Sequence, residues 1–205
     1  MLCQQKQYGS KFLFKNYPKN RSKPFISISI KHAVLIQQKW AKTPLSAEAT
    51  PALTSSQLLT QYLTAEMLLY FKKKCPQDSE ALLLLKLSEL LKFLSLAHHL
   101  SSDLPVSFDI DDLWHLWILQ TRDYQALTKK LPSGAFIHHS SKDYPNHAIL
   151  DQDVILEQQL SFLASYFKNF GPFAEPAIPY WPMAQQLSLS LGSTAKLNTF
   201  LQELQ

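Results

Sequence analysis

Glycine and cysteine are both scarce in this sequence of 205 residues. Four glycines against twelve prolines argue against glycine-rich phosphate-binding loops and against a sheet-rich fold that needs many tight turns. The two cysteines, Cys3 and Cys75, are too few for a disulfide framework or a thiolate zinc site. A reducing compartment is therefore the expected environment, and we predict a cytoplasmic protein.

Long uninterrupted apolar runs are also missing. Lysines interrupt the first residues at short intervals, so we expect no secretory signal. The most apolar later run, Ala81 to Leu96, contains Lys86, Glu89 and Lys92. It falls short of the roughly eighteen apolar residues that span a bilayer. We therefore expect a buried helix there and no transmembrane segment.

The composition that is present favours helices. Hydrophobic residues make up 46% of the chain, which suits one globular core, and leucine recurs with lysine, glutamate and glutamine. We predict an all-α protein with a single compact helical domain at residues 55–205. Residues 1–54 are expected to form a disordered or loosely attached basic arm and a linker.

Charge is distributed unevenly between these two parts. Residues 1–47 carry nine lysines and arginines and no acidic residue, whereas the rest carries eleven basic and sixteen acidic side chains, a net charge of −5. A basic arm of this kind suits an interaction module that binds nucleic acid or an acidic protein partner. A solvated tail, or an arm paired with the acidic body, explains the same pattern.

Periodicity and capping residues predict the elements. The alternation in Phe25–Ile30 predicts a short strand. Helices are expected over 56–74, over 78–98 with its lysines and glutamate on a solvated side, from Ser107 or Asp109 to the turn at 132–134, and over 151–170. Residues 172–182 should be extended and polyproline-like, with Tyr180 and Trp181 pinned on the core. Residues 183–191 and 194–204 are expected to be short helices, and the first of them could equally be a strand.

Polar residues capable of chemistry concentrate between Asp109 and His139. Asp111 and His115 are one helical turn apart, on the side opposite Trp114 and Trp117. The stretch around them is apolar nearly all round, so we expect the pair to be partly buried. The carboxylate can orient the imidazole and leave its other nitrogen free, or both side chains can ligate one metal.

A third ligand for such a metal would come from the paired histidines that follow the turn at 132–134. If Ala135 to His139 is extended, His138 and His139 point to opposite faces, so one of them should join the site. The candidate metal-binding residues are therefore Asp111, His115, His138 and His139, and zinc is a suitable divalent ion. A purely structural Asp–His hydrogen bond remains the competing interpretation.

Motifs for other chemistry are missing. The sequence has no Gly-x-Ser-x-Gly elbow, no phosphate-binding loop and no thiolate pair with zinc spacing. A hydrolase with His115 as its base would need a nucleophile or a metal that the sequence does not identify. Nothing in the chain requires an enzyme, and no catalytic residue is assigned.

Several separated motifs resemble one known family. They are Leu91-Lys92-Phe93-Leu94, Asp111-Asp112-Leu113-Trp114-His115, Ile118-Leu119, Thr121-Arg122 with Tyr124, Gly134-Ala135-Phe136-Ile137-His138-His139, Phe170-Gly171 and Tyr180-Trp181-Pro182. In this order they resemble the bacterial members of the glycine-rich domain-containing protein family, over a core of about residues 81–182. The resemblance implies a compact helical domain, mostly of unknown biochemical function, with Asp111, His115 and His138 or His139 at its polar positions. Trp117 stands where some members have a second histidine.

Overall fold

The computed structural model describes residues 53–97, 106–139 and 152–204. Within these ranges the chain is all-α, as predicted, with nine helices and no strand. The predicted basic arm and the short strand at Phe25–Ile30 lie outside the described residues, apart from the last two residues of the linker. The partner proposed for residues 1–47 therefore stays a prediction.

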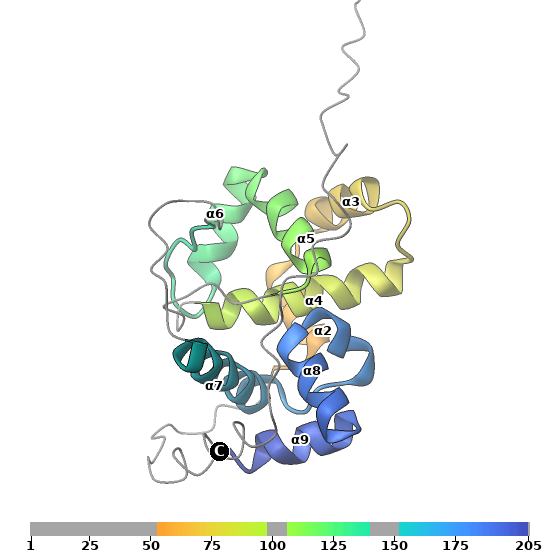
Figure 1. The fold of residues 1–205 in the computed structure, drawn as a ribbon. Coiled ribbons are helices and arrows are strands. Elements are labelled where there is room, and N and C mark those ends of the chain that lie inside the picture. The colour runs from red at the N-terminus through yellow and green to blue at the C-terminus, as the bar shows by residue number, and fades with distance from the viewer. Residues whose placement is uncertain (1–52, 98–105, 140–151, 205) are drawn as a thin grey trace, which may run out of the picture.

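The helices, labelled as in Figure 1, are α2 (Ser55–Tyr62), α3 (Ala65–Lys74), α4 (Glu80–Leu96), α5 (Phe108–Ile118), α6 (Thr121–Lys130), α7 (Gln152–Phe170), the 3₁₀ helix η2 (Glu175–Tyr180), α8 (Pro182–Leu191) and α9 (Thr194–Gln202). Among them, α4 packs against α2, α5, α7 and η2. It crosses the middle of the molecule, with α5 and α6 on one side and α7, α8 and α9 on the other (Figure 1). None of the described helices is long and apolar enough to cross a bilayer.

The helix expected over residues 56–74 is wrong in one respect, because two helices occupy this range. Thr54 caps α2, and its side chain and that of Gln57 each accept from the other residue's backbone N–H. Thr64 is extended and accepts from the Met67 N–H, which starts α3. A threonine hydroxyl that caps a new helix competes with continuation of the old one.

The single helix predicted from Ser107 or Asp109 to the turn at 132–134 is also wrong. It ends at Ile118, and α6 begins at Thr121 after Gln120 leaves the helical conformation, with φ −93° and ψ 68°. The helical face that carries Asp111 and His115 therefore does not extend beyond Ile118.

The segment before α8 differs from its predicted polyproline-like conformation. Residues Glu175–Tyr180 form the 3₁₀ helix η2, which begins with Pro176 in its first turn and accommodates Pro179. Tyr180 and Trp181 are buried, as predicted, with 7% and 3% of their surface exposed. The range 183–191 belongs to α8 and is helical, so its alternative assignment as a strand is wrong.

Helix α4 lacks the solvated side that its alternating charges predicted. Every residue from Lys86 to Leu96 is buried, and Glu89 is only 1% exposed. A buried carboxylate is costly unless it is paired and hydrogen-bonded. The residues that hydrogen-bond to the buried Glu89 carboxylate must therefore lie against α4, which constrains how the rest of the chain packs on this helix.

The Glu89 carboxylate accepts three hydrogen bonds. One oxygen accepts from Lys92 Nζ at 2.7 Å, and the other accepts from Tyr166 Oη at 2.9 Å and from Trp181 Nε1 at 2.8 Å. Lys92 Nζ also donates to Tyr166 Oη at 2.9 Å. Phe173 stacks on Tyr166 with ring centroids 3.9 Å apart. Burial and the neighbouring carboxylate raise the pKa of Tyr166, so its hydroxyl remains a donor.

Glu89→Gln is expected to lower the free energy of unfolding by about 3–5 kcal/mol, because it leaves the Lys92 charge buried without a counter-ion. Urea denaturation measures this loss. The control is Glu80→Gln, which breaks the exposed Lys72–Glu80 pair at 2.8 Å and should cost at most about 1 kcal/mol. Equal losses in the two variants would contradict a central role for Glu89.

Candidate metal centre

The start of α5 is fixed from two directions. The Ser107 side chain caps the helix by accepting from the Ile110 N–H, and the Ser107 N–H donates to the Tyr180 carbonyl at 3.1 Å. Lys86 of α4 lies 2.9 Å from a carboxylate oxygen of Asp109. These contacts hold α5 against α4 and η2, and so place the polar side chains of α5.

A second carboxylate also binds Lys86. Asp78, just before α4, accepts from Lys86 Nζ at 2.9 Å. Burial opposes the charge of this lysine, but its hydrogen bonds with Asp78 and Asp109 carry its pKa above the ordinary value. The lysine therefore remains a cation that joins α4 to both neighbouring segments.

Asp111 and His115 lie on the side of α5 away from the core. Trp114 and Trp117 are buried on the other side, as the helical spacing predicts. The expected partial burial of the pair holds for Asp111, whose side chain is 35% exposed, whereas that of His115 is 51% exposed. Solvent therefore reaches His115.

The chain returns toward α5 after α6 ends at Lys130. Gly134 has φ 61°, a left-handed conformation that glycine adopts without a Cβ penalty, and its N–H donates to the Leu131 carbonyl at 2.9 Å. Residues 135–139 then form neither helix nor strand. Side-chain contacts with α5 and α6 must therefore determine where this segment lies.

A tryptophan and a tyrosine provide those contacts. Trp114 Nε1 donates to Tyr124 Oη at 2.9 Å, and Tyr124 Oη donates to the Ile137 carbonyl at 2.7 Å. The Trp114 ring also meets the His139 ring edge to face, with centroids 4.4 Å apart. Burial raises the pKa of Tyr124 to about 12, although the hydrogen bond from Trp114 lowers it, so the hydroxyl stays protonated at neutral pH.

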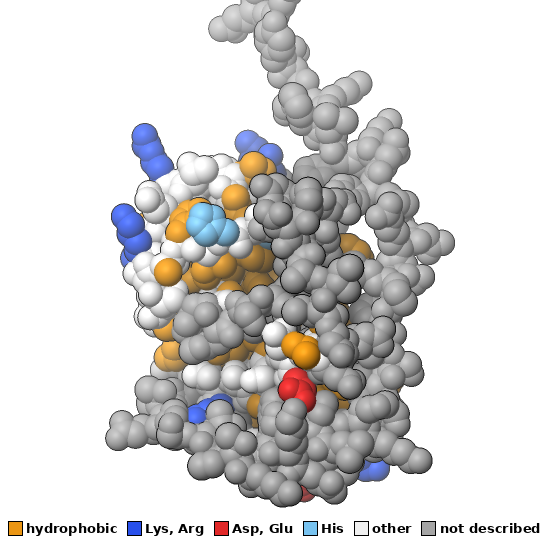
Figure 2. Space-filling model, turned by 60° about the vertical axis from the view of Figure 1, so that its left-hand side comes forward, with side chains coloured by type: hydrophobic (Ala, Val, Ile, Leu, Met, Phe, Trp, Pro, Cys, Tyr) orange, Lys and Arg blue, Asp and Glu red, His pale blue; other side chains and the backbone are white. Residues whose placement is uncertain are grey.

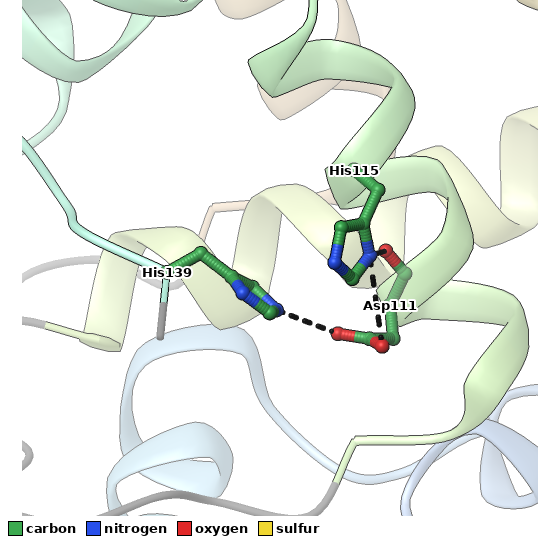
Figure 3. A group of neighbouring side chains, drawn as sticks. All are labelled: Asp111, His115 and His139. Carbon is green, nitrogen blue, oxygen red and sulfur yellow. Dashed lines mark hydrogen bonds and ion pairs between the residues drawn. The ribbon is translucent and has the colours of Figure 1, made fainter. Parts of the chain in front are cut away.

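Asp111, His115 and His139 converge at one point between α5 and the returning segment (Figure 3). One nitrogen or oxygen atom from each of them lies within 4.8 Å of the other two. Asp111 Oδ1 is 2.9 Å from His139 Nε2, and Asp111 Oδ2 is 3.6 Å from His115 Nδ1. The two imidazole rings have centroids 4.3 Å apart.

The partners of the two rings define where their protons lie. His115 Nδ1 is 2.7 Å from the Asp111 backbone carbonyl, which can only accept, so Nδ1 carries hydrogen and Nε2 keeps a lone pair when the ring is neutral. His139 Nε2 faces a carboxylate oxygen, so this nitrogen carries hydrogen. The neutral rings are therefore opposite tautomers, and each has one nitrogen with a free lone pair.

His138, the fourth residue predicted for the metal site, does not join this group. Its side chain is exposed and contacts Phe136, with ring centroids 4.9 Å apart. Figure 2 shows an exposed histidine beside hydrophobic side chains on the face turned toward the viewer. The structure therefore places His139 with Asp111 and His115, and places His138 outside that group.

Tyr124 and Trp114 support this centre, a role that the helical pattern of the sequence does not predict. Aromatic residues with a hydrogen-bonding atom usually find a partner when they are buried, and that tendency was the available signal. The partners themselves depend on the break at Gln120 and on the turn at Gly134.

Comparison with known families, with curated proteins and with solved structures finds no match for this chain. The resemblance to the glycine-rich domain-containing proteins therefore stays a prediction that depends on the quoted motifs. Any functional conclusion must come from the geometry of the centre.

Long-range ¹H–¹⁵N NMR of the imidazoles at neutral to alkaline pH tests this geometry. Neutral His115 should be mainly the Nδ1–H tautomer, and neutral His139 mainly the Nε2–H tautomer, because their acceptors fix the protons. His138 is the internal control and should show the tautomer mixture of an exposed ring. An Nε2–H form of His115 would contradict the hydrogen bond to the Asp111 carbonyl.

Proposed function

We propose that this protein binds a divalent metal ion, with zinc the best suited, through Asp111, His115 and His139. The observation that carries the proposal is the convergence of two imidazoles and one carboxylate within 4.8 Å. Neutral imidazole and carboxylate are ordinary zinc ligands. The three residues come from two segments of the chain, so a bound ion would join α5 to the segment after α6.

The distances require a modest contraction. Tetrahedral zinc with ligand bonds of about 2.0–2.1 Å holds its ligand atoms roughly 3.3 Å apart. The Asp111–His139 distance of 2.9 Å is already this short. The remaining adjustment falls on His115, whose half-exposed side chain has room to turn.

A metal ion and protons would compete for the same ligand atoms of this centre. In the metal-free centre one proton occupies the space between His139 Nε2 and Asp111 Oδ1. Two imidazolium rings with centroids 4.3 Å apart would repel each other beside a single carboxylate. A divalent ion replaces the bridging proton and interacts favourably with all three groups, so binding should release protons and weaken in acid.

Three protein ligands leave a coordination position for water or another molecule, as in zinc sites that are open to substrate. We assign no reaction to this centre. The resemblance to the glycine-rich domain-containing proteins is consistent with these residues, since Asp111, His115 and His138 or His139 fall on the polar positions of their motifs. We propose membership of that family on the same motifs.

A reducing location, such as the cytoplasm, is part of the proposal. Cys75 is free and buried. Burial and the nearby charges of Asp78 and Asp112 raise the pKa of its thiol despite the opposing charge of Lys86, which suits an inert core residue.

Elemental analysis for zinc, iron, manganese and nickel tests the proposal on untagged protein purified without chelator. The wild type is expected to hold about one metal ion per chain, and His115→Ala to lose most of it, because one of three ligands is removed. At a metal concentration about 100 times the dissociation constant, the wild type should gain about 2.7 kcal/mol in free energy of unfolding.

His138→Ala is the matched control, since it removes a neighbouring histidine that lies outside the centre. It should retain the metal content and the metal-dependent stability of the wild type. Wild-type protein that holds no metal, and whose stability zinc and chelator leave unchanged, would overturn the proposal. Asp111 and His139 would then form a structural hydrogen bond.

A further inference from the structure

The returning segment 135–139 has no regular hydrogen-bonded structure of its own. His139, the last residue of this segment, nevertheless has to reach Asp111 on α5. In the described chain, the hydrogen bond from Tyr124 Oη to the Ile137 carbonyl links the backbone of this segment to α6, two residues before His139. Without that bond, only the contacts of the His139 ring itself, with Asp111 and Trp114, and side-chain packing would position the histidine.

The same tyrosine acts on the histidine from a second direction. Trp114 Nε1 donates to Tyr124 Oη, and the Trp114 ring contacts the His139 ring. The hydroxyl therefore fixes the indole that packs against the imidazole as well as the backbone that carries it. With 1% of its surface exposed, Tyr124 has little freedom to move.

We propose that Tyr124 is a positioning residue of the metal centre, which holds His139 in place through the Ile137 carbonyl and through Trp114. This inference depends on the proposed metal binding. Tyr124 does not contact the metal ligands through its hydroxyl, and it supplies no ligand atom. Its role is to keep one ligand oriented before the ion arrives, so that binding does not have to order the segment.

Tyr124→Phe isolates this role, because it removes one oxygen and keeps the ring that contacts Phe136. Competition with a chelator should show zinc affinity lowered by about 10–100-fold, the range typical of lost outer-shell partners of metal ligands. Cobalt substitution gives a second measurement. The absorption spectrum of the cobalt-bound variant should differ from that of the wild type, because His139 is held less well.

Tyr166→Phe is the control for a general loss of stability. This change also removes a buried tyrosine hydroxyl, but one that donates to Glu89 rather than to the returning segment. It should lower the free energy of unfolding while leaving zinc affinity and the cobalt spectrum unchanged. If Tyr124→Phe fails to fold, Trp114→Phe tests the same contacts from the indole and should also weaken zinc binding.

The outcomes separate the two proposals. A wild type that binds zinc, with Tyr124→Phe binding equally well and giving the same cobalt spectrum, would overturn the positioning role and leave metal binding intact. The positioning role would also be overturned if Tyr166→Phe weakened zinc binding as much as Tyr124→Phe does. A wild type that binds neither zinc nor cobalt would overturn the metal centre, and the positioning role with it.

Discussion

The buried carboxylate of Glu89 is the constraint on which the described fold depends. It is almost inaccessible to solvent and needs all its donors, which come from α4 itself, from α7 and from the residue after η2. If these segments separated, the buried Glu89 carboxylate would lose its hydrogen-bond donors. The free-energy cost of an unpaired buried charge is far larger than that of one lost neutral hydrogen bond. The positions of Tyr166 and Trp181 relative to α4 are therefore tightly determined.

Aromatic contacts extend this arrangement to the candidate centre. Trp181 packs against Phe93, Phe93 against Trp114, and Trp114 against His139. Helix α4 also carries Lys86, which holds the start of α5 through Asp109. Helix α4 thus supports the two parts of the chain that form the Asp111 centre. It contacts α5 directly, and it supports the segment that ends at His139 through Phe93 and Trp114.

Local pattern in the sequence was sufficient for the fold class and for the spacing of Asp111 and His115, because both depend on residues within a few turns of one helix. It misassigned the charges of α4 to solvent, since their partners Tyr166 and Trp181 lie more than seventy residues away. It also left His138 and His139 as alternatives. Only the turn at Gly134 and the Tyr124 contact decide which of them reaches Asp111.

Polar groups with unused hydrogen-bonding capacity indicate where this molecule can bind something. In the Glu89 network each of the hydrogen-bonding side-chain oxygen and nitrogen atoms already has a partner, and Glu89 is only 1% exposed. In the described chain, Trp117 Nε1 is a buried donor without a partner, but a lone donor enclosed by the core repels cations and offers no route for a ligand. The Asp111 centre differs from both, since two imidazoles and a carboxylate lie within 4.8 Å of one another and solvent reaches His115. Acceptors gathered in this way are suited to a cation.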